Sequence, residues 1–246
     1  MPNDKNLDVI YVPKGRAREY AELAVNLYEG CTNGCTYCYA PRAMHKSREH
    51  FHSTTTPRKD ILSRLAHDCK MLQGDPREVL LCFSCDPYPK SAITDEDVTR
   101  QALRILALYK MKATVLTKAG MRAVRDFDIL KQQGWSFGTS LVWASDLSRA
   151  KFEPNASPVS SRAEAIRFAH SSGIRTWVSL EPVISPVHAR AVIADLIDVV
   201  DHWKIGKINH CQELEKGVDW KAFADEVRQQ LKGRSFYLKK SLRMYE

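Results

Sequence analysis

The residues around which this chain is organised read Asn26-Leu27-Tyr28-Glu29-Gly30-Cys31-Thr32-Asn33-Gly34-Cys35-Thr36-Tyr37-Cys38-Tyr39-Ala40-Pro41-Arg42. They place three cysteines at the spacing C-x3-C-x2-C. Three thiols so close together cannot all pair as disulfides, because one is always left over. Gly30 and Gly34 give the backbone the freedom to curl around a metal centre. The stretch therefore predicts a metal site with Cys31, Cys35 and Cys38 as ligands.

The spacing alone leaves two kinds of metal centre open. One is a structural zinc ion bound by three cysteines and a histidine, with His45 or a more distant histidine as the fourth ligand. The other is a [4Fe–4S] cluster, for which three thiolates are one fewer than the usual four. In that second case one iron is left open for chemistry.

Several segments make the second kind the stronger prediction. The cysteine stretch, with an aromatic residue just before the last cysteine, resembles the signature of the radical S-adenosylmethionine (radical SAM) superfamily. Further segments resemble the spore photoproduct lyase-like branch of that superfamily in order and approximate spacing. They are Phe83-Ser84-Cys85-Asp86-Pro87-Tyr88-Pro89, Thr117-Lys118-Ala119-Gly120 with Arg125-Asp126, Gly138-Thr139-Ser140-Leu141 and Leu180-Glu181-Pro182.

The resemblance implies a specific chemistry and two cofactors, a [4Fe–4S] cluster and SAM. In the family, the open iron binds the amino and carboxylate groups of SAM. One electron from the cluster then cleaves SAM to methionine and a 5′-deoxyadenosyl radical. An external one-electron donor such as a flavodoxin or a ferredoxin is the implied partner.

Composition places the chain among intracellular globular proteins. The stretch from Met1 to Ile10 has no apolar core, so we do not expect it to be a signal peptide. The longest apolar stretch, Ala189 to Val200, is interrupted by charged residues, so we expect no membrane span. Seven cysteines in such a chain indicate a reducing, cytoplasmic location and use of the thiols for metal or redox chemistry.

The net charge of +8 favours an anionic partner, with DNA the first candidate. Basic residues gather directly after the cysteine stretch and again near residue 240. The predicted contacts to nucleic acid or substrate are Arg42, Lys46, Arg48, Asn209, Lys239 and Lys240.

Short apolar runs alternate with amphipathic helical segments, which predicts an α/β fold with a parallel sheet. We expect strands over 23–28, 78–84, 113–116, 136–142, 175–180 and 203–208, and a last short one over 235–238. Capping boxes at Thr94–Asp97 and Ser161–Glu164 predict helix starts. Six units fit the partial (β/α)6 barrel that the resemblance implies, with residues 1–22 as a lead-in and 23–246 as one domain. A flatter doubly wound sheet of five units is the alternative.

Polar residues follow the predicted strands at their carboxyl ends, where ligands bind in either fold. The expectation is therefore one shared site. Its members are the cysteine loop, Asp86, Lys118, Ser140, Glu181 and Asn209.

The resemblance implies roles for these residues around SAM. Tyr37 lies where the family places an aromatic ring against the adenine. Tyr39 completes a tyrosine pair that brackets Cys38 and takes part in SAM binding and radical transfer. Lys118 corresponds to the partner of the SAM carboxylate, and Ser140 to a hydroxyl contact.

Three further residues have more than one predicted role or partner. Ser84 and Asp86 stand where the superfamily grips the SAM amino group, although Asp86 also suits a turn before Pro87. Glu181 follows an apolar run and needs a partner. That partner is a SAM ribose hydroxyl, the substrate, or a lysine (Lys118 or Lys204) in an ion pair.

Spore photoproduct lyases use a cysteine to return a hydrogen atom to the product radical. Aligned on Asp86, that cysteine falls on Phe83 here, which puts direct lyase chemistry in doubt. Strand alternation would put Cys82 and Ser84 on one face and Phe83 and Cys85 on the other. Cys85 is then the better hydrogen donor, with an inert buried thiol as the alternative.

Three functions follow, of different classes. The first is a radical SAM enzyme of lyase or isomerase type. It would abstract hydrogen from a modified thymine or other pyrimidine in DNA, either to repair a lesion or to rearrange a hypermodified base. The second keeps the cofactors but acts on RNA, a peptide or a small molecule. The third is a zinc-stapled nucleic-acid-binding protein without catalysis.

Overall fold

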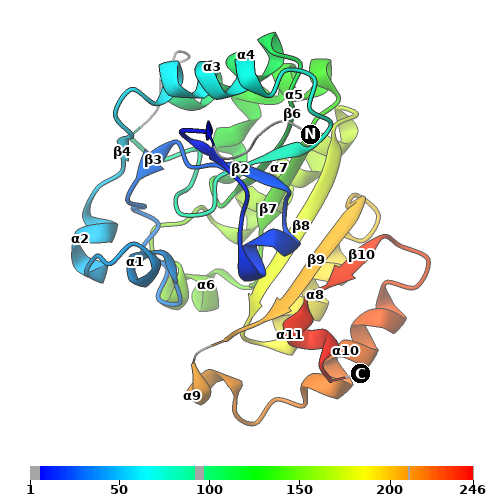
Figure 1. Cartoon of the computed structure of the whole chain (residues 1–246). Helices are drawn as coiled ribbons and strands as arrows, with labels where there is room; N and C mark the ends of the chain where they lie inside the picture. Colours follow the sequence, from blue (N-terminus) through cyan, green and yellow to red (C-terminus); the bar gives the residue numbers. More distant parts are fainter. Residues whose placement is uncertain (1–5, 92–96, 210, 246) are drawn as a thin grey trace.

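A curved sheet of mainly parallel strands forms the centre of the molecule (Figure 1). The computed structural model describes residues 6–91, 97–209 and 211–245. Within these residues the strand order is β1-β2-β5-β6-β7-β8-β9-β10, and only β1 pairs antiparallel. From β2 onward each strand is laid beside the one before it, so the order never reverses. A doubly wound sheet needs such a reversal. The predicted α/β fold with a parallel sheet is therefore confirmed, and the doubly wound alternative is wrong.

The strands of the main sheet are short. They are β1 Ile10–Tyr11, β2 Leu23–Val25, β5 Glu78–Leu81, β6 Lys112–Thr117, β7 Ser136–Ser140, β8 Arg175–Val183, β9 His202–Lys207 and β10 Phe236–Leu238. A separate small sheet pairs β3 Tyr28–Glu29 with β4 Thr56–Pro57. The helical elements are η2 Gly15–Glu19, α1 Ala40–Ala43, α2 Arg48–Ser53, α3 Ile61–Met71, α4 Val98–Leu108, η3 Gly120–Asp126, α5 Phe127–Gln133, α6 Asp146–Phe152, α7 Val159–Ser171, α8 Pro186–Leu196, α9 Gln212–Glu215, α10 Trp220–Gln230 and α11 Lys240–Arg243.

Alternation along the strands separates an apolar outer face from a polar inner one. On β7, Phe137 joins the main hydrophobic core, while Gly138 stands against the indole of Trp177 on β8. Trp177 belongs to a second, small cluster with Ala24 and Leu80. Its Nε1–H donates to the Thr114 hydroxyl at 2.9 Å. The concave side of the sheet is therefore filled at one level by one large ring.

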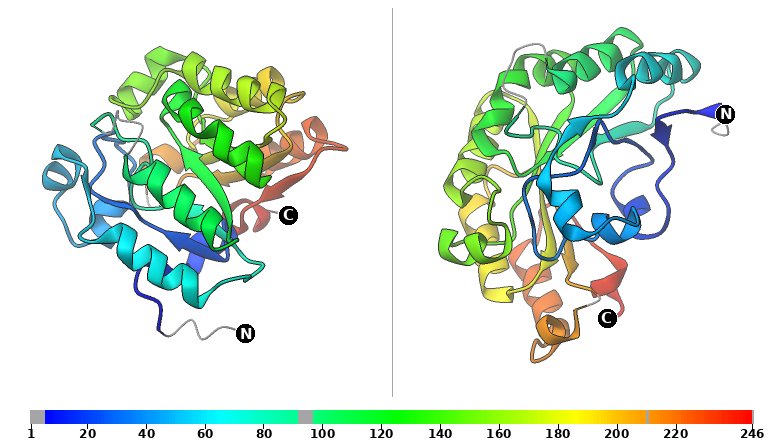
Figure 2. Two further views of the ribbon diagram at one scale, coloured as in Figure 1. Left: turned by 90° about the horizontal axis from the view of Figure 1, so that it is seen from above. Right: turned by 90° about the vertical axis from the view of Figure 1, so that its left-hand side faces the viewer.

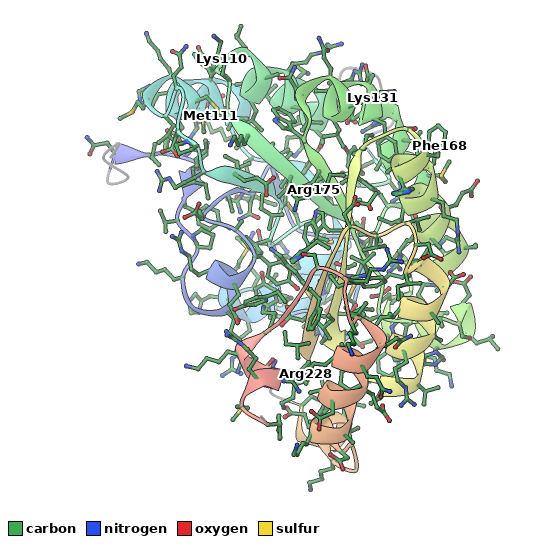
Figure 3. The ribbon with its side chains drawn as sticks, turned by 90° about the vertical axis from the view of Figure 1, so that its right-hand side faces the viewer. Lys110, Met111, Lys131, Phe168, Arg175 and Arg228 are labelled. Carbon is green, nitrogen blue, oxygen red and sulfur yellow. The ribbon has the colours of Figure 1, made fainter. Side chains whose placement is uncertain are left out.

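The longer helices cover the outer, convex side of the sheet (Figure 2). Figure 3 shows this side with its side chains, including Phe168 of α7, which is half exposed. It also labels Arg175, the first residue of β8, and Met111, which precedes β6. They stand at the amino ends of their strands, opposite to the ends that carry the predicted site. None of the described helices is long and apolar enough to cross a membrane.

Besides the pairing of β1 with β2, hydrogen bonds join the lead-in segment to α3 and to the first residue of α11. The buried Asp68 carboxylate of α3 accepts hydrogen bonds from the backbone N–H groups of Asp8, Val9 and Ile10, at 2.7 to 3.0 Å. Glu19, at the end of η2, accepts from the backbone N–H of Lys240 at 2.8 Å. The lead-in thus joins the β2 side of the sheet to the region after β10, across the open seam of the partial barrel.

The first two predicted strands end earlier than expected, for one physical reason. The first stops at Val25 and the second at Leu81, rather than at residues 28 and 84. The Asn26 side-chain oxygen accepts from the backbone N–H groups of Phe83 and Ser84 at 2.8 and 2.9 Å. A side chain therefore takes the place of backbone hydrogen bonds between the strands, at the point where β2 and β5 diverge.

The predicted helix starts need correction. Asp97 is the N-cap of α4, and its side chain accepts from the Arg100 N–H at 3.0 Å. Thr94 lies outside the described residues. Ser161 lies inside α7, which begins at Val159, and its hydroxyl accepts from the Met121 N–H at 3.1 Å. Its hydroxyl therefore joins α7 to η3 instead of capping a helix.

Gly138→Ala should destabilise the barrel. A Cβ at this position would lie 2.2 Å from Trp177 Cε2, so the indole must move out of a filled interior. Overpacking of this kind costs about 1–3 kcal/mol. The measurement is the free energy of unfolding from denaturant titrations of the two proteins. An unchanged midpoint and slope would show that the ring has free space and that the packing described here is incorrect.

Candidate functional site

A cavity of ≈ 490 Å³ opens at the carboxyl ends of the strands. This volume lies within the range of sites for small molecules and cofactors. The structure brings most of the predicted site residues together in its lining. They are Cys31, Cys35, Tyr37, Cys38, Tyr39, Ser84, Cys85, Asp86, Lys118, Ser140, Glu181, Asn209 and Lys239. Arg42, Lys46, Arg48 and Lys240 are not part of the lining.

The loop that carries the cysteines is held by its backbone. Gly30 has a φ of +74°, and a Cβ there would lie 2.2 Å from the Thr54 carbonyl oxygen, so only glycine fits. The Cys31 N–H donates to the Phe51 carbonyl at 3.1 Å. Arg48 donates to the carbonyls of Cys35 and Cys38, at 2.6 and 3.0 Å. Helix α2 therefore fixes the loop from its outer side.

All three thiols of the loop are free. Burial raises the pKa of Cys31, Cys35 and Cys38, which favours the protonated thiols. A metal ligand must be a thiolate, so binding an iron centre releases these protons. His45, the proposed zinc ligand, is exposed and outside the cavity lining. Among the described residues no three His, Cys, Asp or Glu side chains converge on a single ion.

A buried ion pair that the sequence did not reveal lies behind the loop. Arg162 of α7 and Glu153 are fully buried and 2.6 Å apart. The Tyr37 hydroxyl donates to Glu153, and Lys118 Nζ lies 3.9 Å from the same carboxylate. Burial raises the pKa of Glu153, but Arg162 and Lys118 outweigh burial and hold that pKa below its usual value. The network ties the predicted adenine and carboxylate contacts to the barrel wall.

One pattern in the sequence points to this pair. Arg162 shares a helical face with Ala165, Ile166 and Ala169, all buried. A charged residue on a buried face requires a partner. Nothing in the sequence identifies Glu153 as that partner, because it lies after α6 in a segment without periodicity.

Asp86 is a buried junction of three chain segments. Its carboxylate accepts from Asn33 of the cysteine loop at 3.0 Å and from the Tyr88 N–H at 2.9 Å. It also accepts from the Thr117 hydroxyl at 2.6 Å and the Lys118 N–H at 2.8 Å. Both carboxylate oxygens are thus engaged within the protein. The neighbouring Ser84 hydroxyl, by contrast, is buried and has no hydrogen-bond partner.

The expected alternation of Cys82 to Cys85 is wrong. Because β5 ends at Leu81, the residues from Cys82 to Asp86 all line the cavity. The Cys85 thiol is hydrogen bonded to Cys82, and burial raises the pKa of Cys85 well above its usual value. The Cys85 thiol therefore keeps its hydrogen at neutral pH. Tyr39 is more than half exposed at the mouth, and its hydroxyl donates to the Phe83 carbonyl at 3.2 Å.

The far end of the cavity holds a second ion pair, between Glu181 and Lys239 at 2.8 Å. Lys239, predicted as a contact to nucleic acid or substrate, is therefore buried and lines the cavity. The lysine that pairs with Glu181 is likewise neither Lys118 nor Lys204. A Cβ on Gly206 would lie 2.9 Å from the Glu181 carboxylate, so this glycine leaves room for the pair.

Tyr20 of the lead-in segment lines the same end of the cavity and was not among the predicted site residues. Its hydroxyl donates to Glu181 at 2.5 Å, and Lys239 Nζ lies 4.4 Å from the centre of its ring. The segment has no apolar pattern, so the sequence gives no signal that this ring enters the barrel.

The residues present fit an iron–sulfur cluster and SAM. Three free thiols lie on one curled loop, and the cavity beside it has the volume of a cofactor site. The unpartnered Ser84 hydroxyl offers a hydrogen bond to a bound polar group. Lys118, 15 % exposed and only loosely paired, offers a positive charge to a carboxylate.

Comparisons with known proteins agree with this arrangement. Residues 25–200 match the family model described as the radical SAM superfamily. No curated protein matches the chain in sequence. Among solved structures, spore photoproduct lyase complexed with dinucleoside spore photoproduct has a TM-score of 0.68 at 13% identity, over 96% of this chain and 80% of that chain.

A second solved structure is more distant in length. Streptococcus suis SuiB bound to S-adenosylmethionine has a TM-score of 0.63 at 13% identity, over 88% of this chain. The chain spans only about half of the length of SuiB, 49%. At these identities the two likenesses show the fold.

Glu153→Gln should destabilise the protein by about 3–5 kcal/mol, because it leaves the buried Arg162 without a counter-charge. Denaturant titration measures the effect. Glu164→Gln is the matched control, since Glu164 is exposed on the same helix as Arg162. Equal stability of the two variants would contradict a buried ion pair.

The same pair predicts a dependence on pH. The pKa of Glu153 is lowered below its usual 4.5, so its stabilising contribution is present above about pH 4.5. It is lost as the pH falls through the folded-state pKa. The acid-induced loss of stability should therefore be smaller in Glu153→Gln than in the wild type. Parallel stability curves between pH 3 and 7 would contradict this.

Proposed function

The chain belongs to the radical SAM superfamily, and from this premise we propose that it abstracts a hydrogen atom from a modified thymine or other pyrimidine in DNA. Its cofactors are a [4Fe–4S] cluster and SAM. When bound, they supply a 5′-deoxyadenosyl radical by one-electron cleavage of SAM.

Different residues of the chain bind the cluster and the several parts of SAM. Cys31, Cys35 and Cys38 bind the cluster as thiolates. Lys118 binds the SAM carboxylate. Its backbone N–H donates to Asp86, which fixes its position, and its ammonium is only loosely paired with Glu153, at 3.9 Å. Tyr37, fixed through Glu153, provides the ring for the adenine. The Ser84 and Ser140 hydroxyls bind polar groups of SAM.

Asp86 acts indirectly in this proposal. Its four internal hydrogen bonds leave it little capacity to bind the SAM amino group. We assign it the positioning of the cysteine loop against the end of β6. Glu181 likewise acts with Tyr20 and Lys239 to shape the substrate end of the cavity.

The observation that carries the DNA proposal is the charge at the cavity mouth. Lys14 and Arg16 line the cavity that the three cysteines line, and both are exposed. Their side chains make no hydrogen bond or ion pair with another described residue. Free cations beside a cavity of this size suit a phosphodiester whose base enters the cavity. The base must then be unpaired or flipped out of its helix.

A solved relative supports this choice of substrate. Spore photoproduct lyase, which shares the fold over nearly the whole chain, was solved with a dinucleoside spore photoproduct. SuiB, solved also with its precursor peptide SuiA, has a TM-score of 0.52 and matches over 66% of this chain. We therefore place a pyrimidine in DNA ahead of a peptide.

Hydrogen return separates two versions of the reaction. In lesion repair, Cys85 at the cavity wall would give its hydrogen to the product radical, with Tyr39 beside it as a relay. In base rearrangement, the hydrogen returns from 5′-deoxyadenosine and no thiol is consumed. Phe83 at the position of the family's donor cysteine favours rearrangement.

Nucleoside mass analysis after anaerobic incubation with SAM, a reductant and candidate DNAs tests this function. Rearrangement should give a nucleoside of unchanged mass and new retention time, whereas repair should give free thymidine from a cross-linked lesion. Turnover of an RNA, a peptide or a free nucleoside in place of DNA would contradict the assigned substrate.

Lys118→Ala should weaken SAM binding about 10- to 100-fold, since a hydrogen bond between charged groups is worth about 1.5–3 kcal/mol. Equilibrium binding to the reconstituted protein measures it. Iron content should stay unchanged, which separates loss of SAM binding from loss of the cluster. Unchanged SAM affinity would show that Lys118 faces another group.

Reversing the charge of Lys14 and Arg16 together should weaken DNA binding and lower the slope of log affinity against log salt by about 2. The matched control is the pair Lys110→Glu and Lys131→Glu, on the distant face that Figure 3 shows. Both control residues are exposed and outside the cavity lining. Equal losses in both double variants would indicate a general effect of net charge instead of a contact at the mouth.

A further inference from the structure

A basic surface lies on the outer side of the cysteine loop and takes no part in the cavity. It consists of exposed or partly exposed residues of α1, of α2 and of the turn between them. These residues are Arg42, His45, Lys46, Arg48 and His50. None of them lines the cavity. Figure 1 shows α1 and α2 together at the lower left, away from α10 and α11, and Figure 2 (right) shows them on one face.

Helix α2, which carries part of this basic surface, is hydrogen bonded to the backbone of all three cysteine ligands. Arg48 donates to the carbonyls of Cys35 and Cys38, at 2.6 and 3.0 Å. His52 Nδ1 lies 2.7 Å from the Cys31 carbonyl oxygen, while its Nε2 is buried without a partner. One hydrogen bond thus separates α2 from each residue that would hold the cluster. On the other side of the loop lies the cavity in which, in the proposed function, SAM and substrate bind.

We propose that the α1–α2 basic surface binds an acidic one-electron carrier protein that reduces the cluster. The inference rests on the cofactors of the proposed function, and not on its DNA substrate. The oxidised cluster must receive one electron before it can cleave SAM. In the docked complex one electron leaves the reduced carrier and enters the oxidised cluster, with no bond made or broken.

Charge and position both favour a carrier protein over DNA at this surface. Arg42 has no ion-pair partner among the described residues, and Lys46 is paired only at 3.5 Å with the exposed Glu29. Such unsaturated charge attracts an acidic partner. DNA lying here would have its bases against the outer side of the loop, whereas a target base must reach the cavity.

The test reverses two charges and leaves the loop intact. Arg42→Glu with Lys46→Glu replaces two positive charges of this surface by negative ones. Arg48 keeps its hydrogen bonds to the cysteine loop. We expect flavodoxin, the acidic carrier used as probe, to bind the double variant about tenfold more weakly at low salt than the wild type. At high salt the two proteins should bind it alike.

Activity gives a second, separate readout. Formation of 5′-deoxyadenosine driven by reduced flavodoxin should fall about tenfold in the double variant. With dithionite, a small reductant that needs no docking, the rate should stay within about twofold of the wild type. The pair Lys110→Glu and Lys131→Glu serves again as the control and should leave both rates unchanged.

Three outcomes would overturn the proposal. Flavodoxin binding and flavodoxin-driven rates could be unchanged, in which case the carrier docks elsewhere. Equal losses with flavodoxin and dithionite would show damage to the cluster loop. Loss of DNA affinity with unchanged flavodoxin binding would assign the surface to nucleic acid. Failure of the DNA substrate itself leaves all of these measurements intact, so the two proposals are tested separately.

Discussion

The buried carboxylate of Asp86 is the constraint on which the site depends. It accepts four hydrogen bonds, which join the cysteine loop, the turn after β5 and the end of β6. A buried carboxylate is tolerated only when it is satisfied, so these segments must meet there. Through Asn33 the loop is fixed to the barrel, and through Thr117 and Lys118 a predicted SAM contact is fixed to the loop. The relative placement of the cysteine loop and Lys118 thus follows from one side chain.

Two buried ion pairs extend this order to both ends of the cavity. Glu153 and Arg162 hold Tyr37 near the cysteines, while Glu181 and Lys239 hold Tyr20 at the far end. Polar interiors of this kind fix geometry better than they stabilise folding, because desolvation offsets much of their attraction. The barrel is therefore polar inside where ligands bind and apolar outside where helices pack. This division is the physical reason why we propose radical chemistry inside the barrel and electron transfer from the outer side of the cysteine loop.

Much of this could be predicted from the sequence. The alternation of short apolar runs with helical segments predicted the α/β class, and the resemblance added the partial barrel. The cysteine spacing and the polar residues after each strand predicted most of the cavity lining. The position of Lys239 could not be predicted, because burial of a lysine in a basic segment depends on Glu181, far away in the chain. Glu153 and Tyr20 lie in segments without periodicity, so only the fold reveals them. The end of β5 depended on Asn26, a contact between two strands that no local pattern encodes.

Anaerobic reconstitution followed by metal analysis and electron paramagnetic resonance tests the central claim most directly. If Cys31, Cys35 and Cys38 hold a cluster with one open iron beside the cavity, the protein should contain about four irons and matching sulfide per chain. The spectrum of the reduced cluster should change when SAM is added, because SAM binds that open iron. Stoichiometric zinc without sulfide, or a cluster spectrum that SAM leaves unchanged, would contradict the site described here.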